Sequence, residues 1–207
     1  VLTSKFKDET KVETFLTYCQ SANGLIMEQG SERLPDGSVR RIYAFPHRSF
    51  QEYLAGRSLV GPNLGPRVRA LLDQSDQWRD VILLLGEYLC FEVRDQERLD
   101  AILLALAPSA LPDKTRDSDW RAAWFAGELL LLYKRIFEPA PQEDVILRRL
   151  QQIVSRGELS HPERAAAADV LDELGWQPDD LFSFVPLEHP QLGKFLIAKY
   201  PVTNAQY

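Results

Sequence analysis

Histidine is the side chain best suited to reversible contact with a phosphate near neutral pH, and His47 is placed for such a contact. It follows Pro46 at the predicted start of a helix, where unpaired backbone N–H groups and the helix dipole favour anions and a neutral imidazole. A neutral imidazole can still donate one N–H to a phosphate oxygen. The residues alone leave a second interpretation open, a capping or partly buried histidine without a ligand.

A group of carboxylates in the middle of the chain could carry out acid–base chemistry or hold a metal ion. No histidine lies nearby, and Arg94 and Arg98 stand among the acids at spacings that form surface ion pairs. We therefore expect a solvated helix face and no metal site. The acids are Glu87, Glu92, Asp95, Glu97 and Asp100.

No residue is predicted to be catalytic. Cys90 follows Tyr88 and Leu89 within an apolar run and is expected to be a buried, unreactive thiol. His161 belongs to a predicted capping box and His189 to a proline-flanked loop, and neither has a cysteine or aspartate at the spacing that activates a nucleophile.

Arg33, Arg40 and Arg41 flank a predicted hairpin and could contact nucleic-acid phosphates. Their block, residues 1–60, has a net charge of only +1, and no aromatic side chains are interleaved with the three arginines. This pattern favours a solvated hairpin surface, so we expect no nucleic-acid partner.

The composition is that of a globular protein, with 45% hydrophobic and 26% charged residues in a chain of 207. The longest apolar runs are about a third of a membrane span, so we expect no membrane partner. The net charge of −6 lies mainly in residues 61–178 and argues against general affinity for nucleic acid. Two distant cysteines and the absence of an apolar leader predict a cytoplasmic location, and the absence of a starting methionine predicts a domain from a longer chain.

Turn and periodicity signals divide the first block into a helix over Thr10–Ser21, strands at Leu25–Met27 and Arg41–Phe45, and a turn at Pro35–Ser38 between the strands. An apolar stripe from Phe50 to Leu59 predicts a further helix. The order helix, strand, turn, strand is that of the C-terminal half of a winged-helix module.

The middle block is predicted to be helical, and the helix after Ser118 has two apolar stripes, so it should pack on both sides. Asp117 or Ser118 is its predicted N-cap. Trp78, Tyr88, Trp120 and Trp124 are expected to fill the core. Successive helices of this size suggest a HEAT-like α-solenoid. The predicted helices are Pro66–Gln74, Gln77–Cys90, Asp95–Leu106, Ser118–Phe137, Gln142–Arg156 and Glu163–Leu174, followed by strands at Leu181–Pro186 and Lys194–Tyr200.

The segment Tyr43–Gly56 resembles the end of the winged-helix domain in NACHT-type STAND NTPases, the family of animal NOD-like receptors and many bacterial defence proteins. The resemblance implies that His47 contacts the β-phosphate of bound ADP and locks a closed, inactive state. ADP or ATP with Mg would be bound by the intact parent, since this chain has no Gly-x-x-x-x-Gly-Lys-Ser/Thr loop.

The segment Tyr200–Tyr207 looks like the opening motif of formylglycine-generating-enzyme-like domains, the sulfatase-modifying-factor fold. Residues 162–175 are similar to the linker that often precedes that domain in bacterial NACHT proteins. The chain departs from the family at Glu188–Leu192, which lacks the usual Gly-x-Phe-x-Met-Gly turn. The family's catalytic cysteines and metal ligands lie beyond Tyr207, so no activity is implied.

These observations predict a mainly α chain: part of a winged helix with a β-hairpin (1–60), HEAT-like helical repeats (61–178) and a short β segment that begins a formylglycine-generating-enzyme-like domain (179–207). We expect a non-catalytic region, without a cofactor of its own, that closes over the nucleotide site of an upstream NTPase domain and links it to a downstream sensor domain. Oligomerisation on activation and a role in bacterial signalling or antiphage defence follow from the resemblance.

Two alternatives stay open. One is a helical protein-interaction scaffold without nucleotide sensing. The other is the N-terminal extension of a formylglycine-generating-type oxidase.

Overall fold

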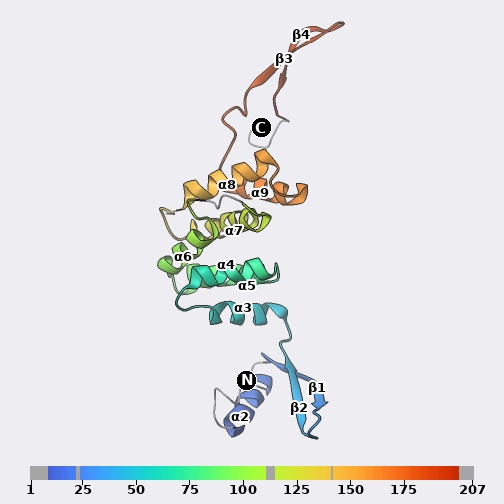
Figure 1. Cartoon of the computed structure of the whole chain (residues 1–207), viewed down its shortest axis with the longest axis vertical. Helices are drawn as coiled ribbons and strands as arrows, with labels where there is room; N and C mark the ends of the chain where they lie inside the picture. The colour runs from blue at the N-terminus through green and yellow to red at the C-terminus, as the bar shows by residue number, and fades with distance from the viewer. Residues whose placement is uncertain (1–8, 22–23, 111–114, 141, 201–207) are drawn as a thin grey trace. The chain divides into compact units, whose positions relative to one another are not determined.

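The structure is a computed structural model that describes residues 9–21, 24–110, 115–140 and 142–200. It is mainly α-helical with two small antiparallel β-hairpins, which confirms the predicted fold class at this level. The chain divides into two compact units, Val1–Ala105 and Leu106–Tyr207, each described by itself below (Figure 1). The finer boundaries near residues 60 and 178 stay a prediction.

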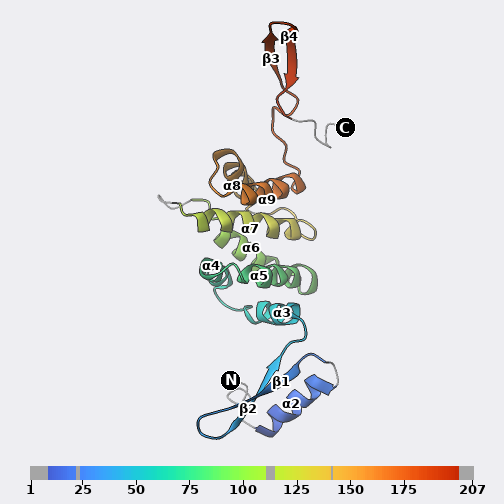
Figure 2. The ribbon, with the colours of Figure 1, turned by 90° about the vertical axis from the view of Figure 1, so that its right-hand side faces the viewer.

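The first unit opens with helix α2 (Glu9–Ser21), close to the predicted range. Strands β1 (Met27–Arg33) and β2 (Val39–Ala44) then form an antiparallel hairpin (Figure 2). The first strand was expected at Leu25–Met27 and lies further along, because pairing with β2 and not apolar composition fixes its position; every residue of β1 is exposed.

The predicted turn closes this hairpin. The Asp36 carboxylate accepts hydrogen bonds from the Ser38 backbone N–H at 2.9 Å and from the Ser38 hydroxyl at 2.6 Å. Both bonds favour the ionised carboxylate, so they hold the pKa of Asp36 below its ordinary value.

Helices form the rest of the first unit. In the predicted Gln77–Cys90 helix, the α-helix ends at Glu87 and the backbone continues as a π-helix, in which the Val93 N–H donates to the Tyr88 carbonyl at 3.1 Å. Leu89 and Cys90, both in this wider turn, are buried. The elements are α3 (Arg48–Ser58), α4 (Leu64–Gln74), α5 (Trp78–Glu87), the π-helix η1 (Tyr88–Glu92) and α6 (Gln96–Leu106).

Close backbone contact joins α4 to α6. A Cβ added at Gly65 would lie 2.2 Å from the carbonyl oxygen of Ala101, so only glycine fits this crossing. The core beside it is aliphatic and includes Val68, Ile102 and Leu103.

In the second unit, helices α7 (Asp117–Tyr133), α8 (Glu143–Arg156) and α9 (His161–Glu173) contact one another. Most residues of the two predicted apolar stripes of α7 are buried, including Trp120, Ala123 and Gly127 of the first and Ala122, Phe125 and Leu129 of the second, as expected for a helix that packs on two sides. Trp124, Leu131 and Leu132 are half-buried, and the apolar Ile136 lies beyond the end of α7 and is exposed.

The predicted capping box at the start of α9 is confirmed, with the Ser160 backbone N–H donating to the Glu163 carboxylate at 3.0 Å. The chain continues into a second antiparallel hairpin, β3 (Phe184–His189) and β4 (Gly193–Ala198). None of the described helices is long and apolar enough to span a bilayer.

Candidate functional site

His47 occupies the N-cap of α3, with extended backbone angles (φ −125°, ψ 136°) just before the first helical residue. Its ring is exposed and makes no capping hydrogen bond. Among the described residues it meets Phe50 edge-on, with ring centroids 6.0 Å apart. His47 therefore occupies the N-cap position, but its ring is neither buried nor hydrogen-bonded as a cap, and both interpretations, with and without a ligand, stay predictions.

Helix α3 is anchored at its far end by a close approach to α5. A Cβ at Gly56 would lie 2.8 Å from the carbonyl oxygen of Val81 and 3.3 Å from the Cβ of Leu85. Because the helices are in backbone contact there, the N-terminal turn that carries His47 belongs to a firmly packed helix.

A polar and aromatic cluster joins α3 to the π-helix. The Tyr53 hydroxyl donates to the Glu92 carboxylate at 2.6 Å, and the Tyr53 and Tyr88 rings meet edge to face at 6.3 Å. The Arg57 guanidinium lies 4.9 Å from the Tyr88 ring centroid and 5.6 Å from that of Tyr53, within cation–π range. The bond to Glu92 favours the neutral phenol and so raises the pKa of Tyr53.

The sequence interpretation missed this cluster. Tyr53 and Arg57 are four residues apart, as are Tyr88 and Glu92, so each pair lies on one side of its own helical segment. That spacing was a usable signal for each pair, but it does not say that the two pairs meet.

An open pocket of about 330 Å³ lies between α3 and α5, and its lining begins at Arg48, the residue after His47. Arg48 at its edge is paired with Glu52 at 2.5 Å, so the local charge is largely compensated. The pocket offers one indole and two side-chain amides, Gln51 and Gln77, but no cluster of unpaired charge. It is lined by Arg48, Gln51, Glu52, Ala55, Gln77, Trp78 and Val81.

Three of the five middle-block carboxylates, Glu87, Glu92 and Glu97, are exposed as expected. Asp95 and Asp100 are half-buried, and the Oδ1 of Asp100 is buried without a hydrogen-bond partner among the described residues. Asp95 forms an ion pair with Arg98, and Glu92 is occupied by Tyr53. No group of three or more histidine, cysteine or acidic residues could hold a metal ion in the part of the chain that the structure describes.

The expected burial of Cys90 is confirmed, and desolvation raises the pKa of its thiol to about 11. His189 was predicted in a loop; it is instead the last residue of β3, because strand pairing with Gly193 extends to it. Its Nδ1 accepts a hydrogen bond from the Gln191 backbone N–H at 3.2 Å.

Arginines on the first hairpin have acidic neighbours. Arg40 pairs with Glu32 across the strands at 2.6 Å, and Arg41 pairs with Glu13. These pairs match the expected solvated hairpin and leave less uncompensated positive charge for nucleic-acid phosphates.

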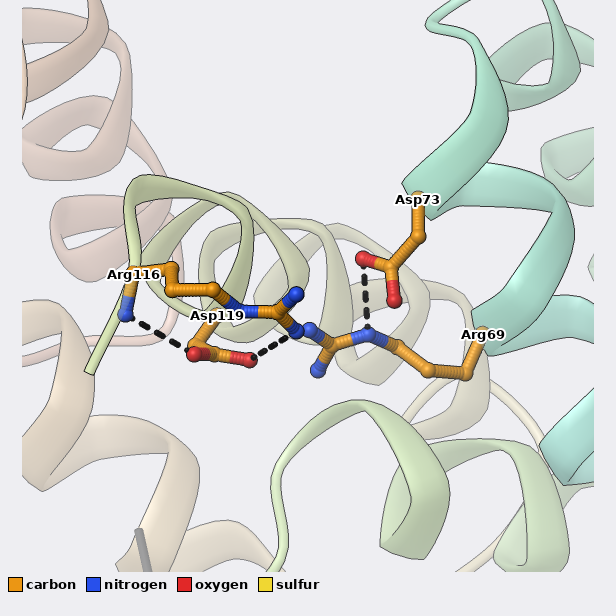
Figure 3. Close-up of polar contacts among 4 residues, drawn as sticks. All are labelled: Arg69, Asp73, Arg116 and Asp119. Carbon is orange, nitrogen blue, oxygen red and sulfur yellow. Dashed lines mark hydrogen bonds and ion pairs between the residues drawn. The ribbon is translucent and has the colours of Figure 1, made fainter. Parts of the chain in front are cut away.

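Figure 3 shows two further ion pairs, each local to its own helix. On α4, Arg69 donates to Asp73 at 3.2 Å. At the start of α7, the buried Asp119 accepts the backbone N–H of Arg116 at 2.9 Å and lies 3.5 Å from its guanidinium. The predicted cap at Asp117 or Ser118 is therefore wrong: the N-cap is Arg116, because the acid at the third helical position supplies the acceptor.

No protein-family model, curated protein or solved structure matches this chain.

Proposed function

We propose that this chain is a non-catalytic regulatory and coupling region of a NACHT-type STAND NTPase. Residues 1–60 would form the end of a winged-helix lid over the nucleotide of an upstream NTPase domain. The HEAT-like arm, residues 61–178, would link that lid to a downstream sensor domain that begins at 179–207 and is similar to formylglycine-generating enzymes. The setting would be cytoplasmic bacterial signalling or antiphage defence, with oligomerisation on activation.

The observation that supports this proposal is the His47 ring. It is exposed, it takes no capping hydrogen bond, and it stands at the first turn of a helix whose other end is anchored at Gly56. A helix N-terminus favours an anion, and a neutral imidazole adds one N–H donor to it.

His47 would need to supply only one hydrogen bond. One hydrogen bond to the β-phosphate of ADP would favour the closed state over the open one, and exchange for ATP would alter that contact. The phosphate-binding loop and the Mg ligands would come from the NTPase domain.

The test uses the longer protein whose reading frame contains this chain. His47→Ala should release bound ADP at least about tenfold faster, because a hydrogen bond to a charged group is worth about 1.5–3 kcal/mol. The measurement is the decay of ADP content in the purified protein, followed by chromatography after dilution into nucleotide-free buffer. His47→Gln, which keeps an N–H donor, should retain part of the effect.

His161→Ala is the matched control, since His161 is also exposed and also begins a helix. Equal ADP retention in His47→Ala and in the control would contradict the proposal. A reading frame without a Gly-x-x-x-x-Gly-Lys-Ser/Thr loop upstream of Val1 would contradict it independently.

A helical interaction scaffold is the second candidate function. Phe15 and Tyr18, one turn apart on α2, are 41% and 61% exposed, and surface aromatics of this kind serve protein contacts. If the chain is only a scaffold, His47→Ala should not change the rate at which the longer protein releases ADP. The third candidate, an extension of a formylglycine-generating-type oxidase, requires active-site cysteines encoded after Tyr207.

A further inference from the structure

The hairpin β3–β4 exposes large apolar side chains on both of its faces. Phe184, Val185, Leu187, Phe195, Leu196 and Ile197 are between 39% and 65% exposed. In the described residues this sheet has only these two strands (Figure 2). Two strands alone are marginally stable in water, so this surface is suited to a partner.

The register assigns the apolar residues to two faces. Val185 and Leu187 share one face with Phe195 and Ile197, while Phe184 and Pro186 share the other with Leu196 and Ala198. Strands that are apolar on both faces are typical of positions inside a wider sheet and not at its edge.

The hydrogen-bond pattern distinguishes the two outer edges. The Lys199 N–H donates to the Ser183 carbonyl at 2.9 Å, and bonded and non-bonded pairs alternate along an antiparallel ladder. Pro186 and Leu196 therefore form a non-bonded pair, in which backbone groups point away from the other strand. On the outer edge of β3, Pro186 has no N–H to offer a further strand. On the outer edge of β4, Leu196 does have an N–H, so the edge of β4 is better suited to pairing with a further strand.

Charge on β4 indicates what kind of strand it accepts. Lys194 and Lys199 flank the apolar residues Phe195–Ala198, and their spacing places one lysine on each face. On its other edge, β4 pairs with a strand of this kind. The apolar residues 184–187 of β3 are followed by Glu188, which lies directly across from Lys194, and Lys199 forms an ion pair with Asp180.

We propose that the outer edge of β4 binds an extended segment of another protein, adding it as a third strand. The segment would carry four apolar residues between two acidic residues, five positions apart. One acid would face Lys194, and the other would share Lys199 with Asp180. Main-chain hydrogen bonds would supply affinity, and the apolar and acidic side chains would supply specificity. The proposal does not depend on the nucleotide role of His47. It is an alternative to the role proposed above for residues 179–207, since further strands of a domain that begins there would take the same edge.

The test uses the full chain and a fluorescein-labelled peptide, Glu-Val-Phe-Val-Ile-Glu, with a lysine-ended version as comparison. Fluorescence anisotropy should show at least tenfold tighter binding of the acid-ended peptide, and raised salt should reduce the difference. Lys194→Glu should remove most of this preference.

Two proline variants test the edge itself. Leu196→Pro removes an outward N–H of β4 without removing a bond to β3, and it should weaken peptide binding at least tenfold. Phe184→Pro makes the matched change on the outer edge of β3 and should leave binding within about twofold of the unmodified chain. Hydrogen exchange of the Lys199 amide shows whether each variant keeps the hairpin.

Three outcomes would overturn the proposal. One is the absence of peptide binding up to millimolar concentration, and another is equal binding by Leu196→Pro and the unmodified chain. The third is protection of the Leu196 amide that rises with protein concentration in the absence of peptide, since this would assign the edge to a second copy of the chain.

Discussion

Helices α7–α9 and the hairpin β3–β4 are both rich in apolar residues, yet they use them in opposite ways. Leu129 and Tyr133 in α7 are fully buried, whereas Leu196 in β4 is 65% exposed. The helices find their partners within the chain: at Gly127, an added Cβ would lie 2.8 Å from Val170 and 2.9 Å from Leu150. Apolar composition therefore predicts burial only where the chain also supplies the covering element.

The largest expected effect tests this contrast with one substitution at two places. Leu129→Ala should lower the free energy of unfolding by about 3 kcal/mol, because it removes packed methyl groups and leaves a cavity. Leu196→Ala should change it by less than about 0.5 kcal/mol, because its side chain is already in water. Urea unfolding followed by circular dichroism measures both, and similar losses would show that the hairpin is covered.

A smaller loss is expected from filling a tight helix crossing. Gly65→Ala should cost about 2 kcal/mol, because the new methyl group meets the backbone of Ala101 and not a side chain that can rotate. Gly61→Ala is the control, since only the end of the Arg67 side chain lies within reach, at 3.5 Å. Equal melting temperatures for the two variants would contradict the close approach of α4 and α6.

The capping box of α9 should contribute less and should depend on pH. Hydrogen bonds from Ser160 and Arg121 lower the pKa of Glu163 in the folded chain, so its contribution is present above its unfolded pKa and is lost as pH falls through the folded value. Glu163→Gln should therefore cost about 1 kcal/mol at neutral pH and progressively less below about pH 4.3.

Urea titrations of the unmodified chain and Glu163→Gln at several pH values provide the measurement. A difference between the two that stays constant down to pH about 3 would show that the carboxylate is not the source of the stability.

The smallest effect concerns the Tyr53 hydroxyl. Tyr53→Phe should lower the urea midpoint slightly, because it removes the bond to Glu92, and Tyr43→Phe should not, because the buried Tyr43 hydroxyl has no hydrogen-bond partner among the described residues. The raised pKa of Tyr53 means that this contribution is present below the unfolded value near 10 and disappears as pH rises through the folded value. A larger loss for Tyr43→Phe would reverse the assignment.

The helical part of the fold was predictable from the sequence, because α7, α8 and α9 carry apolar positions at helical spacing. The start of α9 was marked by Ser160, whereas the N-cap of α7 was not recognised. The π-helix at Tyr88 could not be predicted, since a π turn has the same composition as the α-helix that it continues. The start of β1 could not be predicted either, because its exposed polar residues pair with β2 through backbone groups, and backbone pairing does not appear in a hydropathy pattern.

The candidate site was predictable in part for the same reason. The position of His47 before a helix follows from local sequence, and the structure has it at the N-cap. The Tyr53–Arg57–Tyr88–Glu92 cluster depends on which helices meet, and this information lies in tertiary packing and not in any one segment.

The burial of both cysteines makes the chain a convenient subject for thiol-directed probes. Cys19 and Cys90 are 3% and 0% exposed, and at pH 7 only about one Cys90 thiol in 10⁴ is ionised when its pKa is about 11. A cysteine introduced on the surface, for example Ser49→Cys beside His47, should react with a maleimide dye far faster than either native residue. The anisotropy of that single dye could then follow the first turn of α3 in an otherwise unaltered protein.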